Sequence, residues 1–314
     1  MINLRKKKIL VTGGTGFIGQ YLVNNLIQKR KVPKENIFAP LFKNYDLRKW
    51  GNCQKIVNGQ DIVIHLAAVT GDVEFHKLHP GQIFYDNIIM GVQLMETARL
   101  AGVKKFVGIG SVTAYPEAAP TPFKEEYFWQ GYPAKIHAPY SFAKKMLLVQ
   151  GQAYREEYGF NAIHLLLTSV YGPRENPQSG YIVSSIIKKI IEAKKEEREF
   201  ITAWGTGKPI RDFLFVEDAA EAIVSATEKY NKPDPVNIAS GSEVSIKELV
   251  NLICKLMDFK GKVLWDTSKP DGQLARNVDI SKAKKEFNLT VFTPLEVGLK
   301  KTIEWHLTYD KKNF

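Results

Sequence analysis

A tyrosine and a lysine four residues apart, Tyr140 and Lys144, are the pair in this sequence best suited to acid–base chemistry. In a helix running from Tyr140 to Tyr158, that spacing places both side chains on one face. A free phenol has a pKa of about 10, so it transfers protons poorly near neutrality. A neighbouring ammonium group favours the phenolate and would lower that pKa. The pair predicts a group that gives a proton to a carbonyl oxygen, or takes one from an alcohol, while a hydride moves.

Context separates this pair from Tyr45 and Lys49, which have the same spacing. Only Tyr140 follows both a glycine-rich turn near the N-terminus and a predicted strand that ends in Ser111. An isolated serine at a strand end is usually a turn residue, but here its hydroxyl is suited to bind the carbonyl oxygen that Tyr140 protonates. We therefore predict that Ser111, Tyr140 and Lys144 are catalytic.

The glycine-rich segment from Thr12 to Gly19 follows a predicted strand and opens a predicted helix. Glycine permits the tight turn and lets the backbone approach a pyrophosphate, and the helix N-terminus adds free N–H groups and partial positive charge. The segment thus predicts a dinucleotide site. Its expected contacts are Gly13, Thr15, Gly16, Phe17, Ile18 and Gly19.

The end of the second predicted strand bears on the choice of cofactor. An acidic residue directly after that strand would hold the ribose 2′-OH of NAD, but the segment from Ala39 to Asp46 places none there. The sequence is equally compatible with Lys43 binding a 2′-phosphate and with Lys43 being an ordinary solvated loop residue. NADP(H) is therefore favoured and NAD stays possible, with Asp46 and Leu47 expected beside the adenine.

Apolar strands alternate with helices through the first half of the chain. The predicted strands are 9–11, 37–39, 62–66, 106–109 and 162–167, and the predicted helices are 17–29, 86–101 and 140–158. This alternation predicts the α/β class, with a Rossmann-type doubly wound parallel sheet. Ligands bind beyond the carboxyl ends of such strands, where the glycine turn, Ala67–Ala68, Ser111 and Thr168–Ser169 would meet.

The second half is interrupted by prolines and carries shorter predicted helices at 182–195, 216–229 and 245–257. We expect a smaller mixed α/β domain that closes over the crevice. The expected division is residues 1–170, joined by about 212–240, for the dinucleotide, and residues 171–314 for the substrate.

Composition narrows the classes of partner. The net charge of +11 over 314 residues suits anionic ligands, but the basic residues are scattered and no nucleic-acid motif occurs. Cys53 and Cys254 lie far apart and outside any metal-binding spacing, and no apolar run could span a bilayer. We predict a cytoplasmic protein with no metal, no nucleic acid and no membrane partner.

The remaining cationic and imidazole groups leave alternatives open. Arg211 and Arg276 have the geometry to clamp a diphosphate, although from the residues alone a surface ion pair fits each better. His65 and His164 lie in apolar strands, so we expect core positions for both. No partner ligands accompany His76 and His79, and we expect both to be exposed.

Taken together, the glycine turn, Leu66–Ala68, Asn87, Ser111, Tyr140 with Lys144, and Tyr171–Gly172–Pro173 resemble the extended short-chain dehydrogenases/reductases, the NAD-dependent epimerase/dehydratase family. Four segments, 110–116, 171–176, 204–213 and 269–272, are similar to those of the GDP-L-fucose synthases. The resemblance implies NADPH-dependent reduction of a 4-keto-6-deoxy nucleotide-sugar, with a GDP-sugar favoured, and a homodimer.

The resemblance also implies roles for single residues. Tyr140 would be the acid/base, Lys144 its tuner and a ribose ligand, and Ser111 the carbonyl partner. Asn87 would support the cofactor side of the site. Further cofactor contacts are implied for Leu66, Ala67, Ala68, Ile109 and Val170, and substrate contacts for Thr113, Ser169, Tyr181, Trp204, Arg211 and Arg276.

Two positions depart from the epimerising members of the family. Those members have a cysteine where this chain has Thr113 and a histidine where it has Tyr181. A threonine hydroxyl is a poor acid or base, so the sequence predicts the redox step without 3,5-epimerisation. Val112–Thr113 also lacks the acidic pair of the dehydratases. The alternatives are a 4-epimerase that retains NAD and a non-catalytic dinucleotide-sensing regulator.

Overall fold

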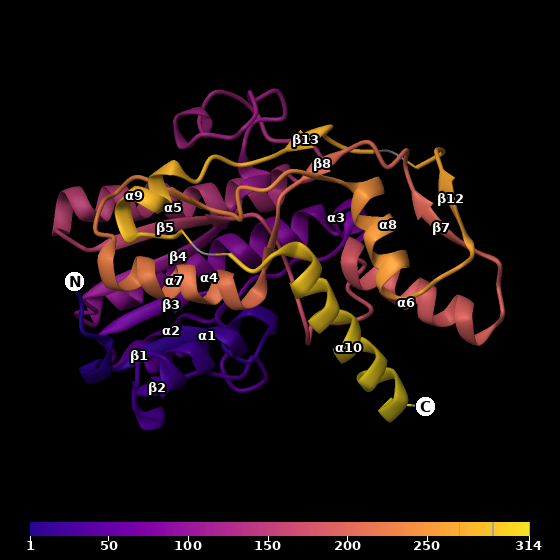
Figure 1. Cartoon of the computed structure of the whole chain (residues 1–314). Helices are drawn as coiled ribbons and strands as arrows, with labels where there is room; N and C mark the ends of the chain where they lie inside the picture. The colour runs from indigo at the N-terminus through magenta and orange to yellow at the C-terminus, as the bar shows by residue number, and fades with distance from the viewer. Residues whose placement is uncertain (270, 291, 314) are drawn as a thin grey trace.

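Six parallel strands form the central sheet of the computed structural model, which describes residues 1–269, 271–290 and 292–313 (Figure 1). Their order is β10-β5-β4-β3-β1-β2. The bounds are β1 (Ile9–Thr12), β2 (Ile37–Phe38), β3 (Ile62–His65), β4 (Lys105–Ser111), β5 (Ala162–Leu167) and β10 (Val236–Ile238). The chain winds in opposite directions from β1, so β1 and β3 flank the switch point at which such sheets bind ligands.

Helices cover both faces of this sheet. On one face α1 (Phe17–Gln28) packs with α7 (Val216–Lys229), and on the other α4 (Pro80–Leu100) packs with α2 (Trp50–Val57) and α5 (Ala138–Tyr158). Successive strand residues alternate between the two cores, with Ile9 on the α1–α7 side and Leu10 on the α4 side. The near-continuous apolar strands of the sequence follow from this burial on both faces.

The second half adds small sheets and a separate core. The paired strands are β6 (Ser169–Tyr171) with β9 (Phe213–Phe215), β7 (Phe200–Trp204) with β12 (Lys262–Asp266), and β8 (Ile210–Arg211) with β11 (Val244–Ser245) and β13 (Ala275–Arg276). Figure 1 shows β7, β12, α6 (Ile182–Lys195) and α8 (Ile246–Leu256) gathered beyond one end of the central sheet. These helices and α10 (Leu295–Asn313) bury an apolar cluster of their own.

Shorter elements complete the fold. They are α3 (Val73–Leu78), α9 (Ser281–Phe287) and the 3-10 helices η1 (Leu4–Lys6), η2 (Lys34–Asn36), η3 (Val112–Ala114) and η4 (Glu125–Tyr127).

The predicted fold class is confirmed, and so are the predicted strands and helices of the first half. Two helices begin earlier than expected: α4 at Pro80 and α5 at Ala138, each with a proline in its first turn, where the missing N–H costs nothing. The division into two domains stays a prediction, although β10 of the second half pairs with β5. Pro270, within the segment 269–272, lies outside the described residues.

Three further features of the described residues bear on the expected partners. None of their helices is both long and apolar enough to cross a bilayer. Cys53 and Cys254 are both free thiols, and Cys53 is buried. No cluster of three histidine, cysteine or acidic side chains in these residues could hold a metal ion.

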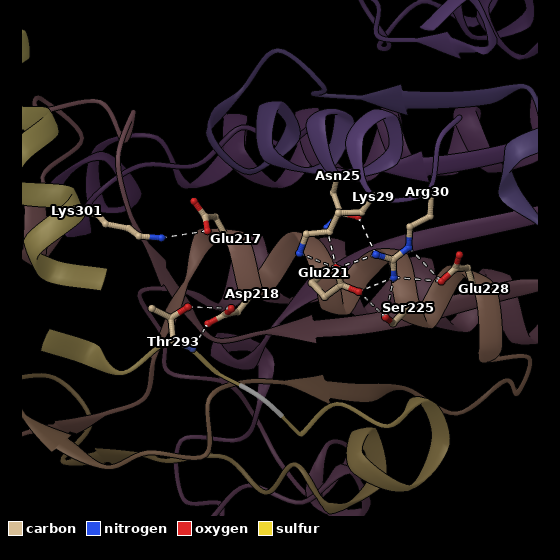
Figure 2. A network of polar contacts seen from close by, with 10 residues as sticks. All are labelled: Asn25, Lys29, Arg30, Glu217, Asp218, Glu221, Ser225, Glu228, Thr293 and Lys301. Carbon is tan, nitrogen blue, oxygen red and sulfur yellow. Dashed lines mark hydrogen bonds and ion pairs between the residues drawn. The ribbon is translucent and has the colours of Figure 1, made fainter. Parts of the chain in front are cut away.

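A polar network joins α1 to α7 across one face of the sheet (Figure 2). Arg30 donates through one terminal nitrogen to Glu221 at 2.8 Å and through the other to Glu228 at 3.2 Å, while Asn25 donates to Glu221 at 3.0 Å. Burial alone would raise the pKa of Glu221, but the bonds from Arg30, Asn25 and Lys29 outweigh it and lower that pKa to about 2. The ionised carboxylate therefore stabilises the packing of α1 on α7.

We expect Glu221→Gln to lower the free energy of unfolding at pH 7 by about 1–2 kcal/mol, after discounting for partial exposure. Because the folded-state pKa is depressed, this contribution is present above about pH 4.5 and is lost as the pH falls toward 2. Urea unfolding across this pH range measures it.

The control is Glu217→Gln, because Glu217 makes one exposed contact, to Lys301 at 3.4 Å (Figure 2). This variant should change stability little. Equal losses in the two variants, or a Glu221→Gln loss that does not shrink in acid, would contradict the assignment.

Candidate active site

Tyr140 and Lys144 lie in the first two turns of α5, as the sequence predicts. Lys144 is only 5% exposed, and its Nζ lies 5.8 Å from the centre of the Tyr140 ring. Burial raises the pKa of Tyr140, with a further contribution from Tyr181, and burial lowers the pKa of Lys144 to about 8. The expected lowering of the Tyr140 pKa is therefore wrong for this structure, because burial of the phenol favours its neutral form. Tyr140 is accordingly a neutral phenol at pH 7, the form that donates a proton.

Ser111 ends β4 and caps the short helix η3. Its Oγ accepts from the backbone N–H of Thr113 at 3.2 Å and from the Thr113 hydroxyl at 2.9 Å. Ser141, the neighbour of Tyr140, donates from its hydroxyl to the Thr113 carbonyl at 3.1 Å. These bonds hold the start of α5 against the turn that carries Ser111, so the three predicted catalytic residues belong to one region.

The glycine turn between β1 and α1 lies against the loop that follows β3. Gly13 has φ +71°, and a Cβ added there would lie 2.8 Å from the Ala67 nitrogen. A Cβ on Gly19 would overlap the Gly13 carbonyl. The backbone N–H of Leu66 donates to the Thr12 carbonyl at 3.1 Å, which fixes the two segments together. Both positions therefore require glycine.

The N-terminus of α1 fits the pyrophosphate of a dinucleotide. The helix begins at Phe17 behind Gly16, whose position provides no side-chain cap, so the first N–H groups are available to an anionic ligand. Thr15 and Gly16 are exposed, whereas Phe17 and Ile18 are partly buried. The residues present thus match what a bound dinucleotide phosphate requires.

Asn87 acts on the backbone of the loop after β3. Its Nδ2 donates to the Val69 carbonyl at 2.7 Å, and its Oδ1 accepts from the Val69 N–H at 3.0 Å. A second bond to the Ile83 carbonyl, also 2.7 Å, anchors the side chain to α4. Asn87 therefore fixes the backbone of Val69 in the loop beyond the carboxyl end of β3.

The segment after β2 contains a cation that sequence reasoning did not select. Lys43 is exposed, whereas Asp46 accepts from Arg48, which also donates to Asp86 at 3.2 Å. The hydrogen bond from Arg48 holds the pKa of Asp46 below its usual range. Leu47 is buried beside this group. Arg48 directly follows Leu47, so it is a further basic residue beside the expected adenosine site.

Arg211 and Arg276 are brought together by the pairing of β8 with β13, in which they are register partners. Arg211 donates to the Ile210 carbonyl and Arg276 to Gln273 Oε1, at 2.7 and 3.0 Å. Within the described residues neither forms an ion pair with a carboxylate, so the alternative of surface ion pairs is wrong. Burial, followed by repulsion from Arg276, lowers the pKa of Arg211 to about 10. Two half-buried guanidiniums side by side, neither in an ion pair within the described residues, suit a diphosphate.

Trp204 and its loop lie near the same strands. Trp204 ends β7 and is 53% exposed, with Lys269 Nζ 5.6 Å from its ring centre. Asp271 accepts from the backbone N–H of Thr206 at 2.6 Å and from its hydroxyl at 2.7 Å, which fixes the loop. An exposed indole held in this way offers a flat surface to a nucleotide base.

The burial of the histidines agrees with the sequence-based expectation except at His76. His65 and His164 are buried in strands, as predicted, and His79 is exposed, also as predicted. His76 is only 5% exposed, so the expectation of an exposed side chain is wrong. Its ring lies edge-on to Tyr140 at 5.8 Å and to His137 at 5.0 Å between ring centres.

His76 escaped prediction because α3, the helix that carries it, is too short to show a periodic pattern. The available signal was its position shortly after β3, at the same edge of the sheet as the glycine turn. His137 was missed for a related reason, since it immediately precedes α5.

The other residues predicted to contact the cofactor or the substrate differ in how far they are buried. Leu66, Ala67 and Val170 are partly buried, Ile109 is buried, and Ala68 and Ser169 are exposed. Tyr181 is the N-cap residue of α6 and is exposed. Their roles in binding stay predictions.

Fold and site together define a doubly wound α/β protein with a Tyr–Lys pair at the carboxyl ends of its strands. Residues 9–239 match the model of the NAD dependent epimerase/dehydratase family. The chain therefore belongs to this family, as an extended short-chain dehydrogenase/reductase.

Relatives extend the match to nearly the whole chain. A GDP-L-fucose synthase from Sinorhizobium fredii is 34% identical over 308 residues, covering 97% of this chain and 96% of that protein. The crystal structure of a GDP-L-fucose synthetase from Naegleria fowleri bound to NADP is 28% identical, with a TM-score of 0.86 over 98% of this chain and 96% of that one. A GDP-mannoheptose C4 reductase from Campylobacter jejuni with NADP bound is 25% identical, with a TM-score of 0.86 over 98% and 99%.

The glycine turn generates a direct test of the dinucleotide site. We expect Gly13→Ala to weaken NADPH binding by about tenfold or more, because the new Cβ meets both the unfavourable positive φ and the Ala67 backbone. Titration of NADPH fluorescence measures the affinity.

The matched control is Gly51→Ala in α2, where an added Cβ meets nothing within 4 Å. This variant should bind NADPH normally and gain slight stability, since alanine is the better helix former. Unchanged NADPH affinity in a folded Gly13→Ala protein would argue against the site.

Proposed function

We propose that this protein is an NADP(H)-dependent oxidoreductase that reduces the 4-keto group of a GDP-4-keto-6-deoxy-hexose. One observation carries the proposal: a neutral, partly buried Tyr140 lies beside Lys144 and is tied through Ser141 to the turn that carries Ser111. Support comes from the GDP-L-fucose synthases and the GDP-sugar C4 reductase that the chain resembles over nearly its full length.

The chain's own residues account for the proton half of the reaction. Tyr140 donates its phenolic proton to the carbonyl oxygen, and Ser111 stabilises that oxygen as charge develops on it. Lys144, with a pKa of about 8, is largely cationic at pH 7 and favours the phenolate that the donation leaves. NADPH, when bound, supplies the hydride that carbon 4 receives.

Binding is divided between the two ends of the crevice. The glycine turn and the loop that Asn87 fixes would hold the dinucleotide, with Lys43 near the 2′-phosphate. The residues expected around the nucleotide-sugar are Arg211 and Arg276 at its diphosphate and Trp204 at its base. The proposal follows the predicted division into a dinucleotide domain, residues 1–170 joined by about 212–240, and a substrate domain, residues 171–314.

We propose the reduction without 3,5-epimerisation. The Thr113 hydroxyl already donates to Ser111, and a threonine hydroxyl is a poor acid or base. The rival readings predict different results with purified protein. Tightly held NAD released by heating would indicate a 4-epimerase, and stabilisation by cofactor without turnover on any nucleotide-sugar would indicate a regulator.

We also propose a homodimer formed through α4 and α5, working in the cytoplasm without nucleic acid. Large apolar side chains are exposed on both helices, among them Phe84 and Tyr85 on α4 and Val149 on α5. The two helices pack side by side, so a second copy could cover both. Two free thiols suit a reducing compartment.

If Tyr140 is the proton donor, removal of its hydroxyl oxygen should greatly reduce turnover. We expect Tyr140→Phe to lower NADPH oxidation with a GDP-4-keto-6-deoxy-hexose by about 100- to 10,000-fold, with NADPH affinity retained. Tyr45→Phe is the matched control, because Tyr45 has the same spacing to a lysine and its ring packs edge-on against Phe38. Absorbance at 340 nm follows both. Comparable turnover in the two variants would remove Tyr140 from the mechanism.

If α4 and α5 form the dimer interface, a charged side chain placed on that interface should dissociate the dimer and lower its measured mass. Wild-type protein should elute at twice the chain mass in light-scattering chromatography, and Tyr85→Glu should shift it toward the monomer. Leu264→Glu, on exposed β12, should stay dimeric. A monomeric wild type, or a dimer that survives Tyr85→Glu, would count against this interface.

A further inference from the structure

Gln273 lies in the turn before β13 and joins Arg276 to the loop that follows β4. Its Oε1 accepts from Arg276 Nε at 3.0 Å, and its Nε2 donates to the Glu117 carbonyl at 2.9 Å. The reversed amide would set donor against donor and acceptor against acceptor, so these contacts require the orientation described. Because Glu117 and Gln273 are 156 residues apart in the chain, only the folded protein brings them together.

The bond to Gln273 fixes the direction of the Arg276 guanidinium. A guanidinium has five N–H donors in one rigid plane, one at Nε and two at each terminal nitrogen. Since Nε is bound to Gln273, the plane of the group is set, and within the described residues neither terminal nitrogen of Arg276 has a hydrogen-bond partner. Terminal N–H groups held in this way can bind a phosphate in the forked arrangement.

The turn that carries Gln273 also borders Arg211. Gly272 has φ +71°, and a Cβ added there would lie 3.9 Å from a terminal nitrogen of Arg211. Arg211 and Arg276 are themselves register partners in the pairing of β8 with β13 (Figure 1). Both arginines therefore lie beside the same turn, and the Gln273 side chain bonds to one of them.

Contacts on either side of Gln273 hold the backbone of this turn. Asp271 accepts from the Thr206 N–H at 2.6 Å. The Leu274 carbonyl accepts from the Ile210 N–H at 2.8 Å, at the start of β8. The amide of Gln273 therefore projects from a fixed backbone rather than from a free loop.

The Glu117 carbonyl belongs to a fixed part of the loop after β4. The N–H of the same residue donates to the Tyr132 carbonyl at 2.9 Å. Further along the loop, the Phe123 N–H donates to the Asn277 carbonyl at 2.8 Å, directly after β13. Since this loop begins at the turn of Ser111, the contacts link that turn to the strand that carries the arginine.

We propose that Gln273 is a positioning residue that orients the Arg276 guanidinium toward the diphosphate of the nucleotide-sugar, with the Glu117 carbonyl as its anchor. This inference rests on the proposed function for the identity of the ligand. Arg276 makes the contact with the diphosphate, and Gln273 acts through Arg276. An arginine held in its binding orientation beforehand loses less conformational entropy when the ligand arrives, so the amide raises affinity without touching the substrate.

The test measures GDP binding to the full-length protein, with NADP present, by isothermal titration calorimetry. Gln273→Met keeps the length of the side chain but removes both hydrogen bonds, and we expect it to weaken GDP about three- to tenfold. Gln273→Glu keeps an acceptor for Arg276 but adds a charge that competes with the diphosphate, so we expect an equal or larger loss. NADPH affinity, measured by fluorescence, should stay unchanged in both variants.

A double variant distinguishes positioning from general damage. Since Gln273 acts through Arg276, Gln273→Met should cause no further loss of GDP affinity in an Arg276→Met protein. The matched control is Gln152→Met, because Gln152 is also partly buried and its amide also donates to a backbone carbonyl, that of Pro233 at 3.3 Å. This control should bind GDP like the wild type, and thermal melting verifies that every variant is folded.

Three results would overturn the inference: normal GDP binding by Gln273→Met or by Arg276→Met, additive losses in the double variant, or a matching loss of NADPH affinity. Failure of the proposed function gives a different result. In that case the wild type itself would not bind GDP, or would not oxidise NADPH with any 4-keto GDP-sugar.

Discussion

Exclusion of water from the carboxyl ends of the strands is the constraint on which the active-site chemistry depends. It raises the pKa of Tyr140 and lowers the pKa of Lys144 to about 8. Tyr140 therefore stays protonated and can donate a proton, and the pKa of Lys144 lies close to physiological pH. The same exclusion of water leaves Arg211 and Arg276 half-buried side by side, and burial lowers the pKa of both, so an anionic substrate would stabilise their charges.

The scaffold holds this crevice from several directions. The α1–α7 network around Arg30 and Glu221 fixes the helix whose N-terminus faces the dinucleotide site (Figure 2). Asn87 fixes the loop after β3, and Ser141 ties α5 to the turn of Ser111. Each contact joins segments far apart in the chain. A small displacement of any one would therefore move a group that has to meet the sugar or the cofactor.

The fold offers a physical explanation for Thr113 and Tyr181, the two positions at which this chain differs from the epimerising members of the family. The Thr113 hydroxyl donates to Ser111, and Tyr181 is the N-cap residue of α6. A threonine hydroxyl and a phenol whose pKa is raised by burial are both poor bases for removing a proton from carbon. We therefore interpret the site as one that orients a keto-sugar and reduces it.

The sequence determined those features that short patterns encode. The glycine turn, the alternation of strands and helices, and the spacing of Tyr140 and Lys144 are local, and each predicted its element or its place in the sheet. Only the tertiary structure decided the direction of the Tyr140 pKa shift, the burial of His76, and the pairing of Arg211 with Arg276. Those properties depend on how much water is excluded and on which distant segments meet, and neither is encoded in the spacing of neighbouring residues.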